Sequence, residues 1–188
     1  MAKDLFASYP YLQSDTLILR KIEKTDLDGM AEIYMNENLF RYTPGSARKT
    51  REAVENIIGH FERDFGKKKT LTLGICLAND PSRIVGIAEM FDYELVARMV
   101  TIGYRIHEAY WGRGIATGAV RLMTNYLFTE IGVNRVQAFV MPENTRSHGV
   151  LQNNGFTREG TIRQGYLWAG RGVVDLTLYS LLRSDLNL

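Results

Sequence analysis

The chain has 188 residues, of which 45% are hydrophobic and 23% are charged, and its formal net charge is +2. This length suits one domain, 1–188, with a sizeable core, and the composition is that of a globular protein and not of a disordered one. The small charge gives no sign of a nucleic-acid partner, and the single cysteine, Cys76, excludes an internal disulfide and a thiolate metal cluster.

Residues 1–6 lack the basic start and apolar core of a signal peptide, and no run reaches the ~18 apolar residues that a membrane helix needs. We therefore expect a cytoplasmic protein without a membrane partner. Cys76 stands among apolar residues, which predicts a buried strand position and not a nucleophile.

The first part of the chain predicts a strand followed by two helices. Residues 16–22 are rich in aliphatic side chains and predict the strand, after which the pair Thr25-Asp26 is expected to cap the first helix. A loop follows at 41–45. Thr50 is expected to cap the second helix, whose apolar residues recur at helical spacing as far as Gly66.

The next part predicts an antiparallel meander. Residues 70–78 and 84–91 predict two strands joined by the turn-forming run 79–82. A third strand over about 95–106 is expected after a turn at 92–94.

The stretch from Tyr110 to Thr117 joins the meander to a helix through a turn that contains Gly112 and Gly114. Amide N–H groups at a helix start lack partners, and the helix dipole favours an anion there, so a phosphate is expected to bind. The third glycine of a GxGxxG fingerprint is absent, because residue 117 is Thr. This pattern leaves two alternatives open, a phosphate cradle and an ordinary structural turn.

The helix after the turn is expected to end near Ile131-Gly132. The strand predicted over 135–141 must then run parallel to the strand before that helix. Asn144 is expected to cap a short helix that Gly155 ends in a left-handed conformation.

Two final strands, over 156–168 and 173–182, flank a hairpin turn at 169–172. The order of elements predicts an α+β fold with a mixed, mostly antiparallel sheet flanked by helices. The apolar run 176–182 permits a homodimer.

The element order, with the glycine turn between the fourth and fifth strands, resembles the GNAT family of acyl-CoA-dependent N-acetyltransferases over nearly the whole chain. Residues 112–116, Gly-Arg-Gly-Ile-Ala, are similar to the family's Q/R-x-x-G-x-G/A pyrophosphate loop. Residues 110–114, 143–147 and 155–160 resemble the branch that acetylates ribosomal-protein N-termini. One departure is Trp111, which stands where the wider family has Gln or Arg.

The resemblance implies that an acetyl group passes from acetyl-CoA to a primary amine by direct attack in a ternary complex, without a metal. The acceptor would be a protein N-terminus or a small amine. Leu151 stands where many members place a tyrosine that protonates the leaving thiolate, and Ser147 is the implied substitute.

The resemblance also implies that the two strands beside the glycine turn splay, so that pantetheine inserts between them. A backbone N–H near residues 104–106 would hold the carbonyl oxygen. Asn144 would reach the pantetheine amides or only cap its helix. The expected coenzyme A contacts are Tyr104, Ile106, Gly112, Arg113, Gly114, Ile115, Ala116, Thr117 and Asn144.

The proposed catalytic base is Glu89, because apolar neighbours on its strand would raise the pKa of its carboxyl. A solvent-facing carboxylate is the alternative, and Asp92 and Tyr166 are weaker candidates. Residues 40–42, Phe-Arg-Tyr, lie in the loop that borders the acceptor groove in this family.

Two other functions are alternatives to acetyl transfer. A non-catalytic acyl-CoA sensor would keep the phosphate cradle without turnover. A nucleic-acid-binding domain based on Lys67 to Lys69 is disfavoured, because aromatic residues do not alternate with basic ones along one face. The histidines His60, His107 and His148 stand alone, so no metal site is expected.

Overall fold

The computed structural model describes residues 3–168 and 170–186, and its eight strands form one sheet in the order β1-β2-β3-β4-β5-β6-β8-β7. Among these pairs only β5 and β6 run parallel. The predicted mixed, mostly antiparallel sheet is therefore confirmed. The strands are β1 Leu12–Gln13, β2 Leu17–Arg20, β3 Thr70–Leu77, β4 Asp80–Glu94, β5 Met99–Ile106, β6 Arg135–Val140, β7 Thr157–Trp168 and β8 Gly172–Leu182.

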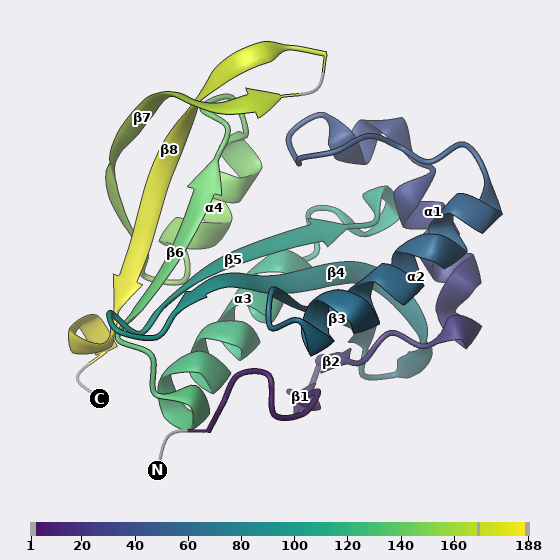
Figure 1. Cartoon of the computed structure of the whole chain (residues 1–188), viewed down its shortest axis with the longest axis horizontal. Helices are drawn as coiled ribbons and strands as arrows, with labels where there is room; N and C mark the ends of the chain where they lie inside the picture. The colour runs from purple at the N-terminus through teal and green to yellow at the C-terminus, as the bar shows by residue number, and fades with distance from the viewer. Residues whose placement is uncertain (1–2, 169, 187–188) are drawn as a thin grey trace.

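Helices cover both faces of the sheet (Figure 1). Helices α1 (Leu27–Tyr34) and α2 (Arg51–Gly66) share one apolar core with the sheet, and α3 (Ile115–Tyr126) and α4 (Thr145–Gln152) pack on the other core. Short helical turns complete the chain: η1 Lys24–Asp26, η2 Glu37–Phe40, η3 Glu108–Tyr110, η4 Leu127–Ile131 and η5 Arg183–Leu186.

The predicted caps of α2 and α4 are confirmed. The Thr50 hydroxyl accepts a hydrogen bond from the Ala53 N–H, and the Asn144 side-chain oxygen accepts one from the Ser147 N–H at 3.3 Å. Gly155 has the expected positive φ, of 79°. The short polar side chains therefore set both helix starts.

The prediction that Asp26 caps α1 is wrong. Its buried carboxylate accepts from the Glu23 N–H at 2.7 Å and from both terminal nitrogens of Arg20, at 2.9 and 2.8 Å. A bidentate arginine is a stronger partner than a helix amide, so this carboxylate ties β2 to the turn before α1.

The boundary predicted between the last two strands of the meander is also wrong. Strand β4 continues to Glu94, and the turn occupies residues 95–98 instead of 92–94. The Glu94 carboxylate accepts from the N–H groups of Val96 and Ala97, at 3.0 and 2.6 Å, and Arg98 has a φ of 50°. These hydrogen bonds form the turn after Glu94. The strand predicted over 16–22 is likewise shorter, at 17–20, and β1 was not predicted.

The C-terminal hairpin is formed by β7 and β8, as predicted, although Ala169 of its turn lies outside the described residues. Strand β8 lies between β6 and β7, so both of its edges are paired within the molecule. Tyr179 and Leu181 are buried. The intramolecular sheet thus accounts for the apolar run 176–182, and the homodimer stays a prediction.

Three other sequence features have plain structural roles. Cys76 is buried in β3, as predicted, and burial raises the pKa of its thiol. Lys68, in the basic run, forms an exposed ion pair with Asp4 at 2.6 Å. In the described part of the chain, no helix combines the length and apolarity needed to cross a membrane.

Candidate functional site

The two halves of the sheet part from each other between β5 and β6. The parallel pairing covers only Met99 to Thr101 on β5 and Arg135 to Gln137 on β6, and the Gln137 amide donates to the Thr101 hydroxyl at the last pair. Beyond it the strands diverge, as Figure 1 shows. The predicted splay is confirmed, and it leaves the edge of β5 from Ile102 to Ile106 without a strand partner on the β6 side.

A groove of about 970 Å³ is lined by the end of β5, the turn before α3, the start of α4 and part of the loop between α1 and α2. That volume is within the range of pockets for large organic ligands. The structure brings most of the predicted site residues together along it: Tyr104, Ile106, Gly112, Gly114, Ile115, Ala116, Thr117, Asn144 and Ser147.

The turn before α3 has the geometry of an anion cradle. Gly112 and Gly114 have φ values of 74° and 76°, which side chains rarely adopt, and no atom lies within 4 Å of a Cβ built at either position. The first hydrogen bond of the helix runs from the Gly118 N–H to the Gly114 carbonyl. The amides before it are the unpartnered donors of a helix start, so the turn fits a diphosphate.

Trp111 fixes this turn to the end of β5. Its indole N–H donates to the Ile106 carbonyl at 2.8 Å, and the guanidinium carbon of Arg146 lies 4.7 Å from the centroid of its ring. Arg113, by contrast, does not line the groove and stacks on Tyr110, at 5.2 Å. The residue that departs from the family pattern therefore positions the cradle and a guanidinium beside it.

The hydroxyl of Tyr104 is buried and has no hydrogen-bond partner among the described residues. Burial raises the pKa of Tyr104 to about 12, and the neighbouring Ser147 opposes the increase. Buried polar groups normally have partners, and the neighbouring Ser147 is the candidate partner of this hydroxyl in the lining of the groove. The Tyr104 side chain was missed at the sequence level, where only its backbone was considered.

Ser147 accepts a hydrogen bond from the Asn144 side-chain amide at 3.0 Å, so its own proton is free to be donated. Leu151 is fully buried and cannot act on a ligand. The ring of His148 is held by the Tyr179 hydroxyl and the Pro142 carbonyl. Within residues 3–168 and 170–186, no three His, Cys, Asp or Glu side chains gather in a metal-binding arrangement.

A second, smaller cavity of about 290 Å³ lies beside the groove, and Arg105 lines both. Glu89 lies in this cavity and not in the groove, so the structure does not bring it together with Ser147. Asp92 and Tyr166 line neither of the two.

Arg105 connects the cavity to the loop between α1 and α2. Only 9% of the residue is exposed, and its guanidinium carbon lies 5.1 Å from the ring centroid of Tyr34 and 4.7 Å from that of Phe40. Its Nε donates to the Thr43 hydroxyl at 3.2 Å, and Nη2 donates to the Pro44 carbonyl at 3.5 Å. Burial raises the pKa of Tyr34 to about 12.

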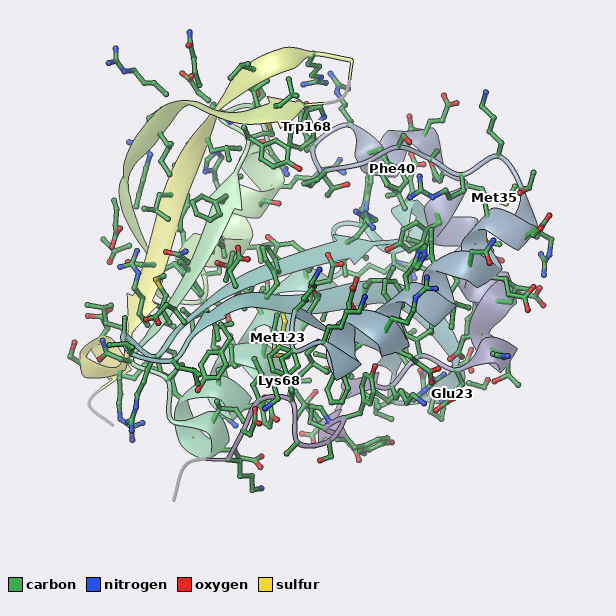
Figure 2. All side chains as sticks on the ribbon, in the orientation of Figure 1. Glu23, Met35, Phe40, Lys68, Met123 and Trp168 are labelled. Carbon is green, nitrogen blue, oxygen red and sulfur yellow. The ribbon has the colours of Figure 1, made fainter. Side chains whose placement is uncertain are left out.

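The same loop meets the β7–β8 hairpin at the mouth of the groove. Tyr42 packs against a small apolar cluster that includes Trp168, and the guanidinium carbons of Arg41 and Arg171 lie 5.2 and 5.9 Å from its ring centroid. Figure 2 labels Phe40 on the loop and Trp168 on the hairpin. The family resemblance implies that the loop borders the groove, but no local pattern in the sequence indicates its contact with the hairpin.

Comparison with known proteins identifies the chemistry of this fold. The family model for the acetyltransferase (GNAT) domain matches residues 16–157. The chain is 27% identical to the uncharacterized N-acetyltransferase YoaA of Bacillus subtilis over 93% of its own length and 98% of that protein. It is 30% identical to YdaF of the same organism, a candidate ribosomal N-acetyltransferase, over 92% of this chain and 94% of that one.

The fold is also similar to that of Mycobacterium smegmatis RimJ, solved in complex with CoA-disulfide. The TM-score is 0.85 with 22% sequence identity, and the match covers 100% of this chain and 93% of that one.

Proposed function

The chain belongs to the GNAT acetyltransferase family and is an acetyl-CoA-dependent N-acetyltransferase, and from this premise we propose that its acceptor is the α-amino group of a protein. The observation that carries the proposal is the groove itself, which joins an anion cradle to a splay between two strands and opens at the other side onto an arginine-rich mouth. The similarity to YdaF, which is named for ribosomal acetylation, supports a protein acceptor.

The donor side of the groove, formed by the end of β5 and the starts of α3 and α4, binds acetyl-CoA mainly through backbone groups. The amides from Gly112 to Thr117 hold the diphosphate at the start of α3, and Arg146 adds positive charge from its position on Trp111. The open edge of β5 pairs with the amides of pantetheine. Bound acetyl-CoA supplies the acetyl group as a thioester, and a backbone N–H in the stretch from Tyr104 to Ile106 stabilises the charge that develops on its carbonyl oxygen.

Ser147 is the proposed proton donor to the leaving thiolate. Its hydroxyl is oriented by Asn144 and lies beside the unpartnered hydroxyl of Tyr104. Tyr104 shares this role: its phenol is protonated at neutral pH, as that of any tyrosine is, so it can donate a hydrogen bond to Ser147 or to the sulfur.

Glu89 is the proposed proton acceptor for the attacking amine. It acts from the smaller cavity, which meets the groove at Arg105. An amine that arrives neutral and well placed needs little assistance beyond water, so the loss of Glu89 is expected to slow turnover less than the loss of Ser147.

The test is an acceptor screen with acetyl-CoA, read out by thiol release and by the mass of the product. The panel contains peptides with free N-termini, the same peptides with blocked N-termini as matched controls, and spermidine. We expect acetylation of the free α-amino groups only. Transfer to spermidine or to lysine side chains alone would overturn the acceptor assignment, and coenzyme A binding with no transfer to any acceptor would favour the sensor.

A further inference from the structure

The arginines on the acceptor side of the groove stack on aromatic rings instead of pairing with carboxylates. Arg41 and Arg171 share the ring of Tyr42, and Arg105 lies near two further rings. Among the described residues, none of these three has a carboxylate within 4 Å, as is true of most arginines of the chain apart from Arg20, Arg51, Arg83 and Arg135. The mouth therefore carries positive charge without a nearby counterion.

Two carboxylates line the groove, but neither neutralises this charge. Glu108 accepts hydrogen bonds from the side-chain amides of Asn36 and Asn38, which lower the pKa of its carboxyl. Glu143 lies just before α4, on the donor side. Local charges on the loop and the hairpin thus favour an anionic group in a bound molecule.

The burial of Arg105 independently indicates that an anionic group binds on this side of the groove. The residue is 91% buried, and a buried guanidinium is costly unless its charge is paired and its N–H groups are bonded. A guanidinium has five N–H donors, of which Arg105 directs two to Thr43 and Pro44 and one to the Tyr34 hydroxyl, so two remain. The remaining donors suit the two oxygens of a carboxylate.

The smaller cavity is lined by one carboxylate, that of Glu89, and by two arginines, Arg48 and Arg105. Ile87 pairs with Arg105 and Glu89 pairs with Gly103 in the β4–β5 ladder, so the two charged side chains share a face as diagonal neighbours, ~7–8 Å apart at the backbone. They form no ion pair within 4 Å. Such a site matches a molecule that carries an amine and a carboxylate a few bonds apart.

We propose that the acceptor is an amine with a carboxylate beside it, as in a protein N-terminus followed by acidic residues, whose carboxylates bind Arg41, Arg171 and Arg105. This inference rests on the proposed acetyl transfer to a protein α-amino group. A free acidic amino acid offers the same chemistry and fits a cavity of about 290 Å³, so both sources enter the test. A polyamine would meet like charges at the mouth.

The experiment compares three peptides of equal length that begin with serine and continue with two aspartates, two asparagines or two lysines, together with free aspartate. We expect kcat/KM for the aspartate peptide to exceed that for the asparagine peptide at least ~10-fold, which corresponds to about 1.4 kcal/mol. The lysine peptide should be the poorest, and added salt should narrow the differences. A better rate with free aspartate than with any peptide would assign the small molecule as the source.

Substitutions of Arg41 and Arg171 test whether these arginines cause the preference for the acidic peptide. The double variant Arg41→Gln with Arg171→Gln should reduce the preference to below ~3-fold by raising KM for the acidic peptide, with kcat unchanged. Arg41→Glu should shift the preference toward the lysine peptide. Arg63→Gln, an exposed arginine of α2 that lines neither the groove nor the cavity, is the matched control and should retain the preference.

Two results overturn the inference while leaving acetyl transfer intact. These are equal kcat/KM for the acidic and neutral peptides, and a preference that survives in the double variant. Coenzyme A binding without transfer to any acceptor would instead overturn the proposed function and this inference together.

Discussion

Consecutive residues of β5 serve the two sides of the groove by different means. Side chains alternate along a strand, so Tyr104 belongs to the face covered by α3 and α4, whereas Arg105 belongs to the face covered by α1 and α2. On the donor side, the proposed cradle consists of backbone amides at the turn that contains Gly112 and Gly114. On the acceptor side, stacked arginines carry the charge.

The two sides of the groove should therefore respond differently to substitutions. A site made of backbone amides tolerates most changes of side chain and fails when a bulky or charged group enters it. A site made of side chains changes its preference with single substitutions while its fold persists. Four variants test the contrast, from the largest expected effect to the smallest, and a fifth tests the stability of the C-terminal half of the sheet.

Gly114→Glu should weaken coenzyme A binding at least ~100-fold, because the carboxylate would meet the diphosphate in the cradle. Calorimetric titration with coenzyme A measures the loss. Gly170→Glu is a matched control, since Gly170 has a φ of 77° and equally open space but lies on the hairpin. If Gly114→Glu binds coenzyme A within ~3-fold of the wild type, the cradle assignment is wrong.

Ser147→Ala should lower kcat ~10-fold or more while the Kd for coenzyme A changes less than ~3-fold, because a proton donor acts in the transition state. Steady-state kinetics beside binding measurements separate the two effects. Wild-type turnover would remove Ser147 from the mechanism.

Tyr104→Phe adds a stability readout on the same strand. Among the described residues, its buried hydroxyl has only the neighbouring Ser147 as a candidate partner, so its removal should lower the free energy of unfolding by less than about 1 kcal/mol, while turnover falls. A clear loss of stability would show that the hydroxyl supports the fold instead of the reaction.

Trp111→Phe should weaken coenzyme A binding ~3–10-fold, because it removes the indole hydrogen bond to Ile106 but keeps a ring for Arg146. Trp168→Phe is the matched change on the acceptor side and should leave this affinity unchanged. Equal losses in both variants would contradict the separation of the two sides.

Glu159→Gln should destabilise the C-terminal half of the sheet by about 1 kcal/mol, after allowance for solvent exposure. Hydrogen bonds from Arg135, at 2.6 and 2.9 Å, and then from Ser180 lower the pKa of Glu159 to about 2. This stabilisation is complete above the usual carboxyl pKa and is lost as the pH falls through about 2.

Denaturation of the wild type and Glu159→Gln at pH 7, 4 and 2.5 measures that difference, which should shrink with falling pH. Glu55→Gln, an exposed change on α2, is the control. A difference that stays constant with pH would show that ionisation of Glu159 is not its source.

Local patterns explain why most of the fold was predictable. Polar caps at Thr50 and Asn144, and the positive φ at Gly155, follow from interactions within a few residues. The errors arose where a competing hydrogen-bond partner outweighed the local rule. Asp26 looks like a helix cap, but Arg20 binds it more strongly than the helix amides do.

The sequence by itself determined the glycine turn and the helix start to which the proposed cradle is assigned, because these residues are consecutive in the chain. Only the tertiary structure decided the acceptor side. It stacked Arg41 and Arg171 on one ring and placed Glu89 apart from Ser147. These contacts join residues far apart in sequence, and the strand register and side-chain packing that create them leave no local pattern.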